Sequence, residues 1–202
     1  MAEYQVPEAE QISEIEIKRS RFICYLARAE NREQAQTYIS QVRAQHPQAR
    51  HVCWAYIAGP PGTTVLSMSD DGEPSGTAGR PMLAALQYSG VVEVVAAVVR
   101  YFGGIKLGTG GLQRAYSDSV VAALQACPMV ACQPMELCRI EFPFADEAAV
   151  RRLLEELAVS LVAVEYGQSV AMKVAVPAVD STLFGERLTT ITAGRAQLKA
   201  LE

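Results

Sequence analysis

The sequence is poor in the residues that build metal centres and disulfide frameworks. It holds two histidines, His46 and His51, and five cysteines, an odd number. No C-x-x-C pair occurs among them. Because a zinc site needs several such ligands at close spacing, we expect no metal ion, and no cofactor motif is present. Unpaired cysteines of this kind are typical of reduced thiols and predict a cytoplasmic protein.

Long apolar runs are also missing. No stretch reaches the roughly 18 apolar residues that a membrane-spanning helix requires. Residues 1–10 lack the basic segment and apolar core of a secretory signal. We therefore expect no membrane partner. What is present, 50% hydrophobic and 20% charged residues, is the composition of a folded globular protein.

The charge pattern gives a weak indication of nucleic-acid binding. The net charge is −4 at pH 7, which excludes a protein that binds nucleic acid through its overall charge. Residues 18–50 nevertheless carry seven basic side chains against two acidic ones, Glu30 and Glu33. Either this segment forms a basic face on an acidic protein, or its charges are ordinary solvated surface.

A glycine-rich segment follows the most apolar run of the chain. Residues 94–99 predict a buried strand, and residues 100–112 continue as R-Y-F-G-G-I-K-L-G-T-G-G-L. A helix pattern then begins near Gly111. Free N–H groups and the positive end of the helix dipole make such an entrance an anion site. Alternatively, the glycines only turn the chain and let the helix pack close to a sheet.

A second glycine-rich helix entrance lies at residues 69–79, S-D-D-G-E-P-S-G-T-A-G, with Thr77 or Gly79 as the predicted cap of the next helix. Neither entrance matches a standard nucleotide fingerprint. Together with nearby basic side chains they predict a pocket for phosphate or carboxylate. Its candidate residues are Gly76, Thr77, Gly79, Arg80, Arg100, Gly103, Gly104, Lys106, Gly108, Thr109, Gly110, Gly111 and Arg114. We expect Arg100→Ala to weaken anion binding without unfolding the protein.

No catalytic residue can be assigned from the sequence. Asp70, Asp71 and Glu73 are the catalytic candidates if the protein is an enzyme acting on a small phosphorylated substrate. Acidic residues beside glycine and proline are also common in plain turns. A dyad of Cys53 and His51 would share one face of a strand, but no third orienting group is evident.

The element pattern predicts an α+β protein of two domains, residues 1–130 and 134–202, with a linker near two prolines at 128 and 134. The first domain is expected to contain a hairpin (14–18 and 22–27), a helix capped by Asn31, strands at 51–58 and 94–99, and helices starting near 79 and 111. The second is expected to run as strand 136–142, a helix capped by Asp146, hairpin 161–166 and 169–176, helix 179–188 and strand 195–201. That order is the ferredoxin-like β-α-β-β-α-β arrangement.

Two long motifs carry a resemblance to a known family. D-D-G-E-P-S-G-T-A-G-R-P-M at 70–82 and V-V-R-Y-F-G-G-I-K-L-G-T-G-G-L at 98–112 resemble the bacterial YigZ/IMPACT family, as do K-R-S-R-F at 18–22 and H-P-Q-A-R-H at 46–51. The resemblance implies an N-terminal domain of the left-handed β-α-β type shared with elongation factor G domain IV, ribonuclease PH and GHMP kinases. It also implies a C-terminal ferredoxin-like domain similar to those of elongation factor G.

The resemblance implies a role near translation. Eukaryotic relatives restrain a stress kinase through a separate N-terminal module that this sequence lacks, so that partner is not carried over. What remains is a non-enzymatic protein that binds RNA or the ribosome and contacts phosphate-bearing ligands. Two alternatives stay open: an enzyme acting on a small phosphorylated substrate, and a protein-interaction module using the ferredoxin-like sheet. An exposed apolar patch on that sheet would favour the last.

Overall fold

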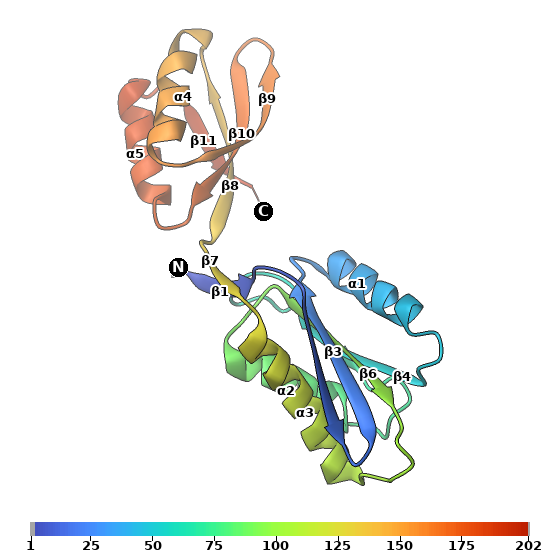
Figure 1. Cartoon of the computed structure of the whole chain (residues 1–202). Coiled ribbons are helices and arrows are strands. Elements are labelled where there is room, and N and C mark those ends of the chain that lie inside the picture. The colour runs from blue at the N-terminus through green and yellow to red at the C-terminus, as the bar shows by residue number, and fades with distance from the viewer. Residues whose placement is uncertain (1–2, 202) are drawn as a thin grey trace. The chain divides into compact units, whose positions relative to one another are not determined.

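The computed structural model describes residues 3–201, which form two compact units (Figure 1). One unit is Tyr4–Cys132; the other runs from Gln133 onward and includes Glu3, whose carboxylate accepts a hydrogen bond from Gln133 Nε2 at 3.1 Å. The described chain holds five α-helices and three antiparallel sheets. An α+β protein of two domains is therefore confirmed.

The first unit is built on a five-stranded antiparallel sheet with the order β2-β3-β6-β4-β5. Its elements are β1 (Tyr4–Pro7), β2 (Gln11–Ile17), β3 (Ser20–Arg28), α1 (Arg32–Gln45), β4 (His51–Ile57), β5 (Leu66–Ser69), α2 (Gly79–Ser89), β6 (Val94–Tyr101), α3 (Thr109–Ala126) and β7 (Met129–Cys132). The expected hairpin, helices and central strands are all present within a few residues of their predicted limits.

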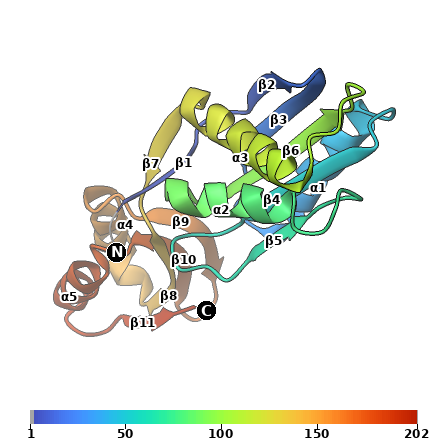
Figure 2. The same cartoon turned by 90° about the horizontal axis from the view of Figure 1, so that it is seen from below.

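Helices cover both faces of this sheet. Val94, Ala96 and Val98 of β6 pack against α2 and α3, and the residues between them pack on the opposite face. That opposite face is covered by α1 through Ile39 and Val42. Figure 2 shows α2 and α3 side by side. Because β6 is buried on both faces, it carries an unbroken apolar run instead of an alternating one.

The two crossover connections of the sheet have opposite hands. β3 and β4 run parallel on either side of β6 and are joined through α1, whereas β5 and β6 run parallel on either side of β4 and are joined through α2. The first connection crosses the sheet from β3 to β4, and the second crosses it in the opposite direction, from β5 to β6. The strands joined by the first run antiparallel to those joined by the second, and the two helices lie on opposite faces of the sheet. One of them is therefore left-handed, a rarity among β-α-β connections.

The sequence patterns missed a small two-stranded sheet. β1 pairs with β7 in antiparallel register, with Val6 opposite Val130. The segment around Pro128 was predicted as a linker, yet it contains β7. Both strands are four residues long and lie beside prolines, so they carry too little alternation to be recognised.

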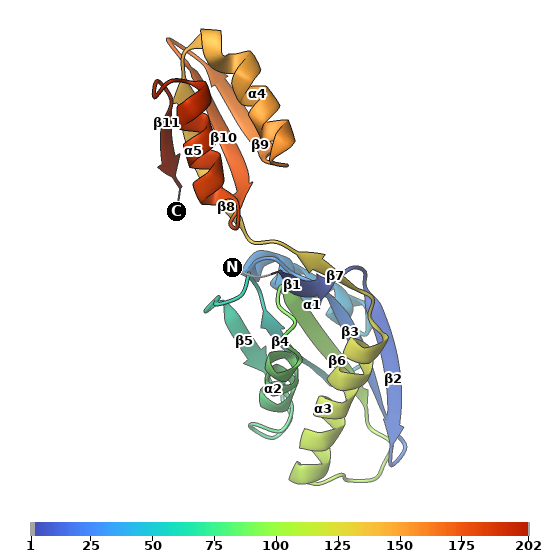
Figure 3. The same cartoon turned by 90° about the vertical axis from the view of Figure 1, so that its left-hand side faces the viewer.

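The second unit follows the predicted order β-α-β-β-α-β (Figure 3). Its elements are β8 (Met135–Phe142), α4 (Glu147–Glu156), β9 (Ser160–Tyr166), β10 (Val170–Pro177), α5 (Ser181–Ile191) and β11 (Gln197–Ala200), in the sheet order β11-β8-β10-β9. Asp146 precedes α4 as predicted but makes no side-chain cap bond. Its carboxylate instead binds Arg195 at 2.7 Å, which fastens α4 to the approach of β11.

Only one face of this second sheet is covered by helices. Ile140, Met172 and their same-face neighbours pack under α4 and α5. The other face carries a row of cations, because Arg139 lies opposite both Lys173 and Lys199 in the strand register. We find no aromatic side chain of β8 or β10 on that open face, so it lacks the stacking platform by which some sheets bind bases.

Candidate functional site

The strand register brings the two sequence motifs to one end of the first unit. Arg100, near the end of β6, pairs with His51 at the start of β4, and Tyr101 pairs with Arg21 at the start of β3. The glycine-rich loop, residues 102–108, therefore leaves the sheet beside the β2–β3 turn. The acidic loop at 70–78 reaches the same end, because Asp71 Oδ2 accepts the β4 amide of Val52 at 2.7 Å.

Gly103 holds the glycine-rich loop against the β2–β3 turn. A Cβ placed on Gly103 would lie 2.0 Å from the carbonyl of Arg19, so no other residue fits there without movement. The Gly103 amide donates to Ser20 Oγ at 3.1 Å. The turn itself consists of Lys18 and Arg19, with φ of 48° and 65°. Two consecutive non-glycine residues with positive φ present both basic side chains at the tip, a strained arrangement that often marks a functional site.

The entrance of α3 has free backbone donors. Its N-cap, Gly108, has a φ of 74° and offers no side-chain cap. Within the described chain, we find no hydrogen-bond acceptor for the amides of Thr109, Gly110 and Gly111. A Cβ at Gly110 would meet nothing within 4 Å, so the space above this turn is open. The geometry is suited to an oxyanion, as the sequence predicts for this entrance.

The entrance of α2 is different, because the protein fills it with its own carboxylate. Asp70 Oδ1 accepts the amides of Ala78 and Gly79 at 2.9 and 2.8 Å, and Oδ2 accepts that of Gly76 at 2.8 Å. Burial raises the pKa of Asp70, but these three hydrogen bonds outweigh it and hold the pKa below its usual value. Thr77 was a predicted cap, yet its hydroxyl donates to the Pro74 carbonyl. An external anion would have to displace Asp70.

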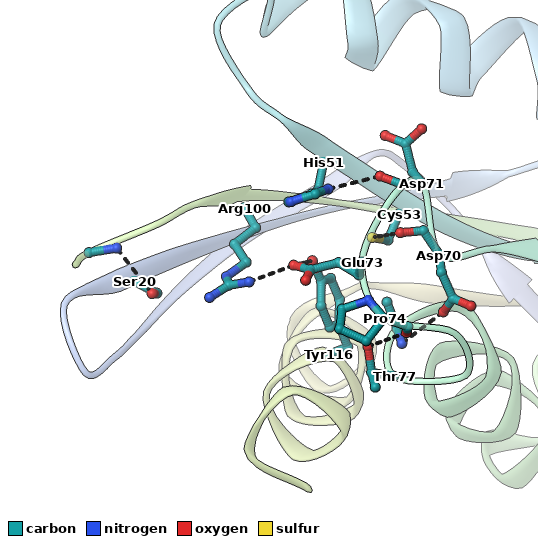
Figure 4. A network of polar contacts seen from close by, with 12 residues as sticks. Ser20, His51, Cys53, Asp70, Asp71, Glu73, Pro74, Thr77, Arg100 and Tyr116 are labelled. Carbon is teal, nitrogen blue, oxygen red and sulfur yellow. Dashed lines mark hydrogen bonds and ion pairs between the residues drawn. The ribbon is translucent and has the colours of Figure 1, made fainter. Parts of the chain in front are cut away.

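The other two acids of the loop are also engaged. Asp71 binds Arg43 at 2.9 Å as well as the Val52 amide. Glu73 is buried and accepts hydrogen bonds from Arg100 Nη1 at 2.7 Å and from the Tyr116 hydroxyl at 2.8 Å (Figure 4). Each of the three carboxylates therefore holds the loop to its surroundings, as a structural turn requires.

The Arg100 side chain is buried at this end of the unit and does not lie on its surface. Its side chain is 8% exposed, and its guanidinium lies 5.5 Å from the ring centroids of both Phe22 and Phe102. Removing one member of a buried ion pair costs about 3 to 5 kcal/mol. The structure thus gives no support to the expectation that Arg100→Ala leaves folding intact.

Cys53 and His51 do not form a catalytic dyad. The Cys53 thiol donates to the Asp70 carbonyl at 2.9 Å, and burial raises its pKa to about 12. His51 Nδ1 bonds to the Asp71 carbonyl at 2.8 Å. Both side chains therefore tie β4 to the acidic loop. Among the described residues, no group of histidine, cysteine and acidic side chains is arranged to hold a metal ion.

Six exposed basic residues surround this end, and within residues 3–201 none of them forms a salt bridge, although the charge of Arg80 helps to lower the pKa of Asp70. We call this set the basic end: Lys18, Arg19, Arg50, Arg80, Lys106 and Arg114. Its members come from the β2–β3 turn, the approach to β4, both helix entrances and the glycine-rich loop. A hydrogen bond from Gln113 Nε2 to the Gly76 carbonyl, at 3.4 Å, connects the two helix entrances.

Two exposed apolar side chains at this end were not predicted. Phe102 is 58% exposed and Ile105 is 43% exposed, both in the glycine-rich loop. The sequence does carry a signal for Phe102, since an aromatic residue directly before two glycines falls outside the strand's buried run. No helix in the part of the chain that the structure describes is long and apolar enough to cross a membrane.

Comparisons with known proteins cover both units. Residues 18–124 match the family model of the Impact N-terminal domain, and residues 140–195 match a domain of unknown function, DUF1949. An IMPACT family member of Haemophilus influenzae is 40% identical over 203 residues, spanning 100% of this chain and 98% of the relative. The IMPACT family member YigZ of Escherichia coli K12 is 40% identical over 203 residues, spanning 100% of both chains.

A further relative and a solved structure agree with this assignment. The IMPACT family member YvyE of Bacillus subtilis is 37% identical over 186 residues, spanning 92% of this chain and 85% of the relative. A crystal structure described as that of a hypothetical protein superposes with a TM-score of 0.82 at 40% identity. The alignment covers 100% of this chain and 98% of that one.

Proposed function

The chain belongs to the IMPACT family, and from that premise we propose that it binds single-stranded RNA or an RNA surface of the ribosome through its basic end, without catalysing a reaction. The observation that carries the proposal is the set of six unpaired, exposed cations around a helix entrance whose amides are free. An end of this kind provides both point charges and backbone donors for phosphate groups.

The exposed loop side chains favour a single strand over a duplex. Phe102 lies beside the cations and presents most of its ring to solvent. A base stacked on an aromatic ring contributes about 1 to 3 kcal/mol to binding, and only unpaired bases can reach such a ring. The fold adds support by likeness: the left-handed β-α-β and ferredoxin-like domains that the family resemblance implies also occur in translation factors.

The contacts of the acidic loop argue against an enzyme that uses the carboxylates of this loop as catalysts. Asp70, Asp71 and Glu73 all hold neighbouring amides or arginines, so none is available as a general base. The open sheet of the second unit is a mixed surface. Charged residues such as Arg139 and Lys173 lie on it beside the exposed Met135 and Leu137, so it is less distinctive as a protein-contact surface than the basic end is as a phosphate-binding one.

A salt series on the full-length protein tests the proposal. With about five phosphate contacts to single-stranded RNA, log K should fall with log salt at a slope of about −3.5. Gly110→Val should weaken binding about tenfold, because its side chain would project into the space above the α3 amides, where a Cβ meets no other atom within 4 Å. The matched control is Gly167→Val in the second unit, where the space is equally open. Absence of binding at low salt would overturn the proposal.

A further inference from the structure

A hollow of about 390 Å³ opens between the segment that follows α1, the start of β4 and the end of β6. It is lined by Gln48, Arg50, His51, Arg100, Tyr101 and Phe102. Its volume is in the range that small ligands occupy in proteins. Most of its lining residues were not among the predicted anion-binding residues, because they come from segments far apart in the sequence.

The donors in this hollow are only partly used. Arg100 directs Nη1 to Glu73, whereas we find no partner for its Nε or Nη2 within residues 3–201, and the Nε atom is buried. The unused Nε–Nη2 edge is the pair of parallel N–H groups that binds an oxyanion in bidentate fashion. A buried donor without an acceptor is destabilising, and a bound oxyanion would supply the acceptor.

A neighbouring arginine adds to this anion preference. His51 does not, because its Nδ1–H donates to the Asp71 carbonyl and Nε2 of the neutral ring is then an acceptor. Arg50 is exposed and has no ion-pair partner in the described chain. Among the described residues, the carboxylate that forms a salt bridge with Arg100 is that of Glu73, and it already accepts two hydrogen bonds. Cationic groups therefore outnumber acidic ones.

The rim of the hollow suits a planar group. Phe102 is 58% exposed there and lies 5.5 Å from the Arg100 guanidinium. The wall formed by Tyr101 is held in place, because its hydroxyl bonds to His46 Nδ1 at 2.8 Å. A ligand with a phosphate in the hollow could thus stack a base on Phe102.

We infer that this hollow binds the phosphate of a nucleoside monophosphate, with Arg50 and the free edge of Arg100 on the oxygens and the base on Phe102. The group is either the terminal nucleotide of an RNA strand or a free mononucleotide. The first source rests on the proposed function and would make the protein a reader of strand ends. The second stands without it.

Calorimetric titration of the full-length protein separates these sources. The probes are AMP against adenosine, and one short RNA carrying phosphate at its 5′ end, at its 3′ end or at neither. We expect AMP to bind about tenfold more tightly than adenosine, and one terminal phosphate to strengthen RNA binding by a similar factor. Arg50→Ala should remove both gains, whereas Arg32→Ala, the same charge change at the far end of α1, should leave them.

The outcomes distinguish the two proposals. One outcome is that RNA binds equally well with and without a terminal phosphate, and that AMP and adenosine bind with equal affinity. That outcome overturns phosphate binding in the hollow and leaves the proposed RNA binding intact. AMP binding that depends on Arg50, without any RNA binding, supports the hollow and overturns the proposed function. If Arg50→Ala and Arg32→Ala lose the phosphate-dependent gain in affinity equally, the gain comes from the overall charge of the protein and not from the hollow. That result overturns the inference.

Discussion

Asp70 shows how one residue can reverse the meaning of a motif. A glycine-rich helix entrance preceded by acids was interpreted as an anion site, with the acids as catalysts across it. In the structure, the acid itself is the anion: its carboxylate accepts three amides around the start of α2. The sequence could not reveal this, because a capping carboxylate that lies six to nine residues before its amide partners has no fixed spacing to recognise.

The first prediction concerns this carboxylate. Asp70→Ala should lower the free energy of unfolding by about 2 kcal/mol, because charged hydrogen bonds to buried amides are lost. Urea denaturation measures the change, with exposed Asp118→Ala on α3 as the control. The stabilisation by Asp70 should be present at neutral pH and vanish as the pH falls through the depressed pKa of its carboxyl. Equal stability of the two variants would refute the capping role.

A second prediction concerns His46, which lies between two tyrosine hydroxyls. Its Nε2 is 2.6 Å from Tyr25 Oη, and its Nδ1 is 2.8 Å from Tyr101 Oη. Burial, and then the charge of Arg21, lower the pKa of His46 below its value in an unfolded chain. As the pH falls below about 6.5, the unfolded chain binds a proton that the folded protein does not, so stability should decrease.

Thermal unfolding measures that decrease when it is followed at about pH 7.5 and at about pH 5.5, one on each side of the ordinary histidine pKa. His46→Gln keeps a neutral donor and acceptor between the two tyrosines and should flatten the pH dependence. The idea fails if wild type and variant lose stability in parallel.

At the scale of elements, the glycine-rich segment at residues 100–112 combines two kinds of glycine. Gly103 is packed against the Arg19 carbonyl, whereas Gly110 faces open space. The sequence left both readings open, close packing or ligand approach. The structure shows close packing at Gly103, and ligand approach at Gly110 stays a prediction. Spacing alone could not separate them, since the contact depends on a hairpin more than 80 residues away.

Substitution of these glycines should therefore have opposite consequences. Gly103→Ala should cost about 3 kcal/mol, because the new Cβ collides with backbone that cannot move independently. Gly110→Ala, in the first turn of α3, should leave stability unchanged or slightly raised. Chemical denaturation of both variants provides the comparison, and a Gly103→Ala protein as stable as wild type would contradict the packing role.

Most elements were predictable from local patterns. The helix from Arg32 begins where Asn31 caps it, with Asn31 Oδ1 accepting the Gln34 amide at 2.9 Å, and it ends before Pro47. The order of the second unit followed from alternation and helix periodicity. β1 and β7 were missed because they are short, and their pairing joins residues 122 to 128 positions apart in the chain.

On the scale of the whole molecule, charge is distributed unevenly. The net charge is −4, yet six unpaired cations gather at one end of the first unit. Other arginines, such as Arg21, Arg151 and Arg187, pair with glutamates. The charge of the whole chain thus says little about the charge of a surface, and only the strand register showed which basic residues lie together.

The most direct test of the central claim is a comparison of two double charge reversals. Fluorescence anisotropy would measure binding of single-stranded RNA at low salt, about 50 mM. Lys106→Glu with Arg114→Glu changes the basic end, and Lys173→Glu with Lys199→Glu makes the same change on the open sheet of the second unit. We predict at least a tenfold loss of affinity, or about 1.4 kcal/mol, for the first pair and little change for the second. Equal losses in both, or no binding by the wild-type protein, would contradict the account.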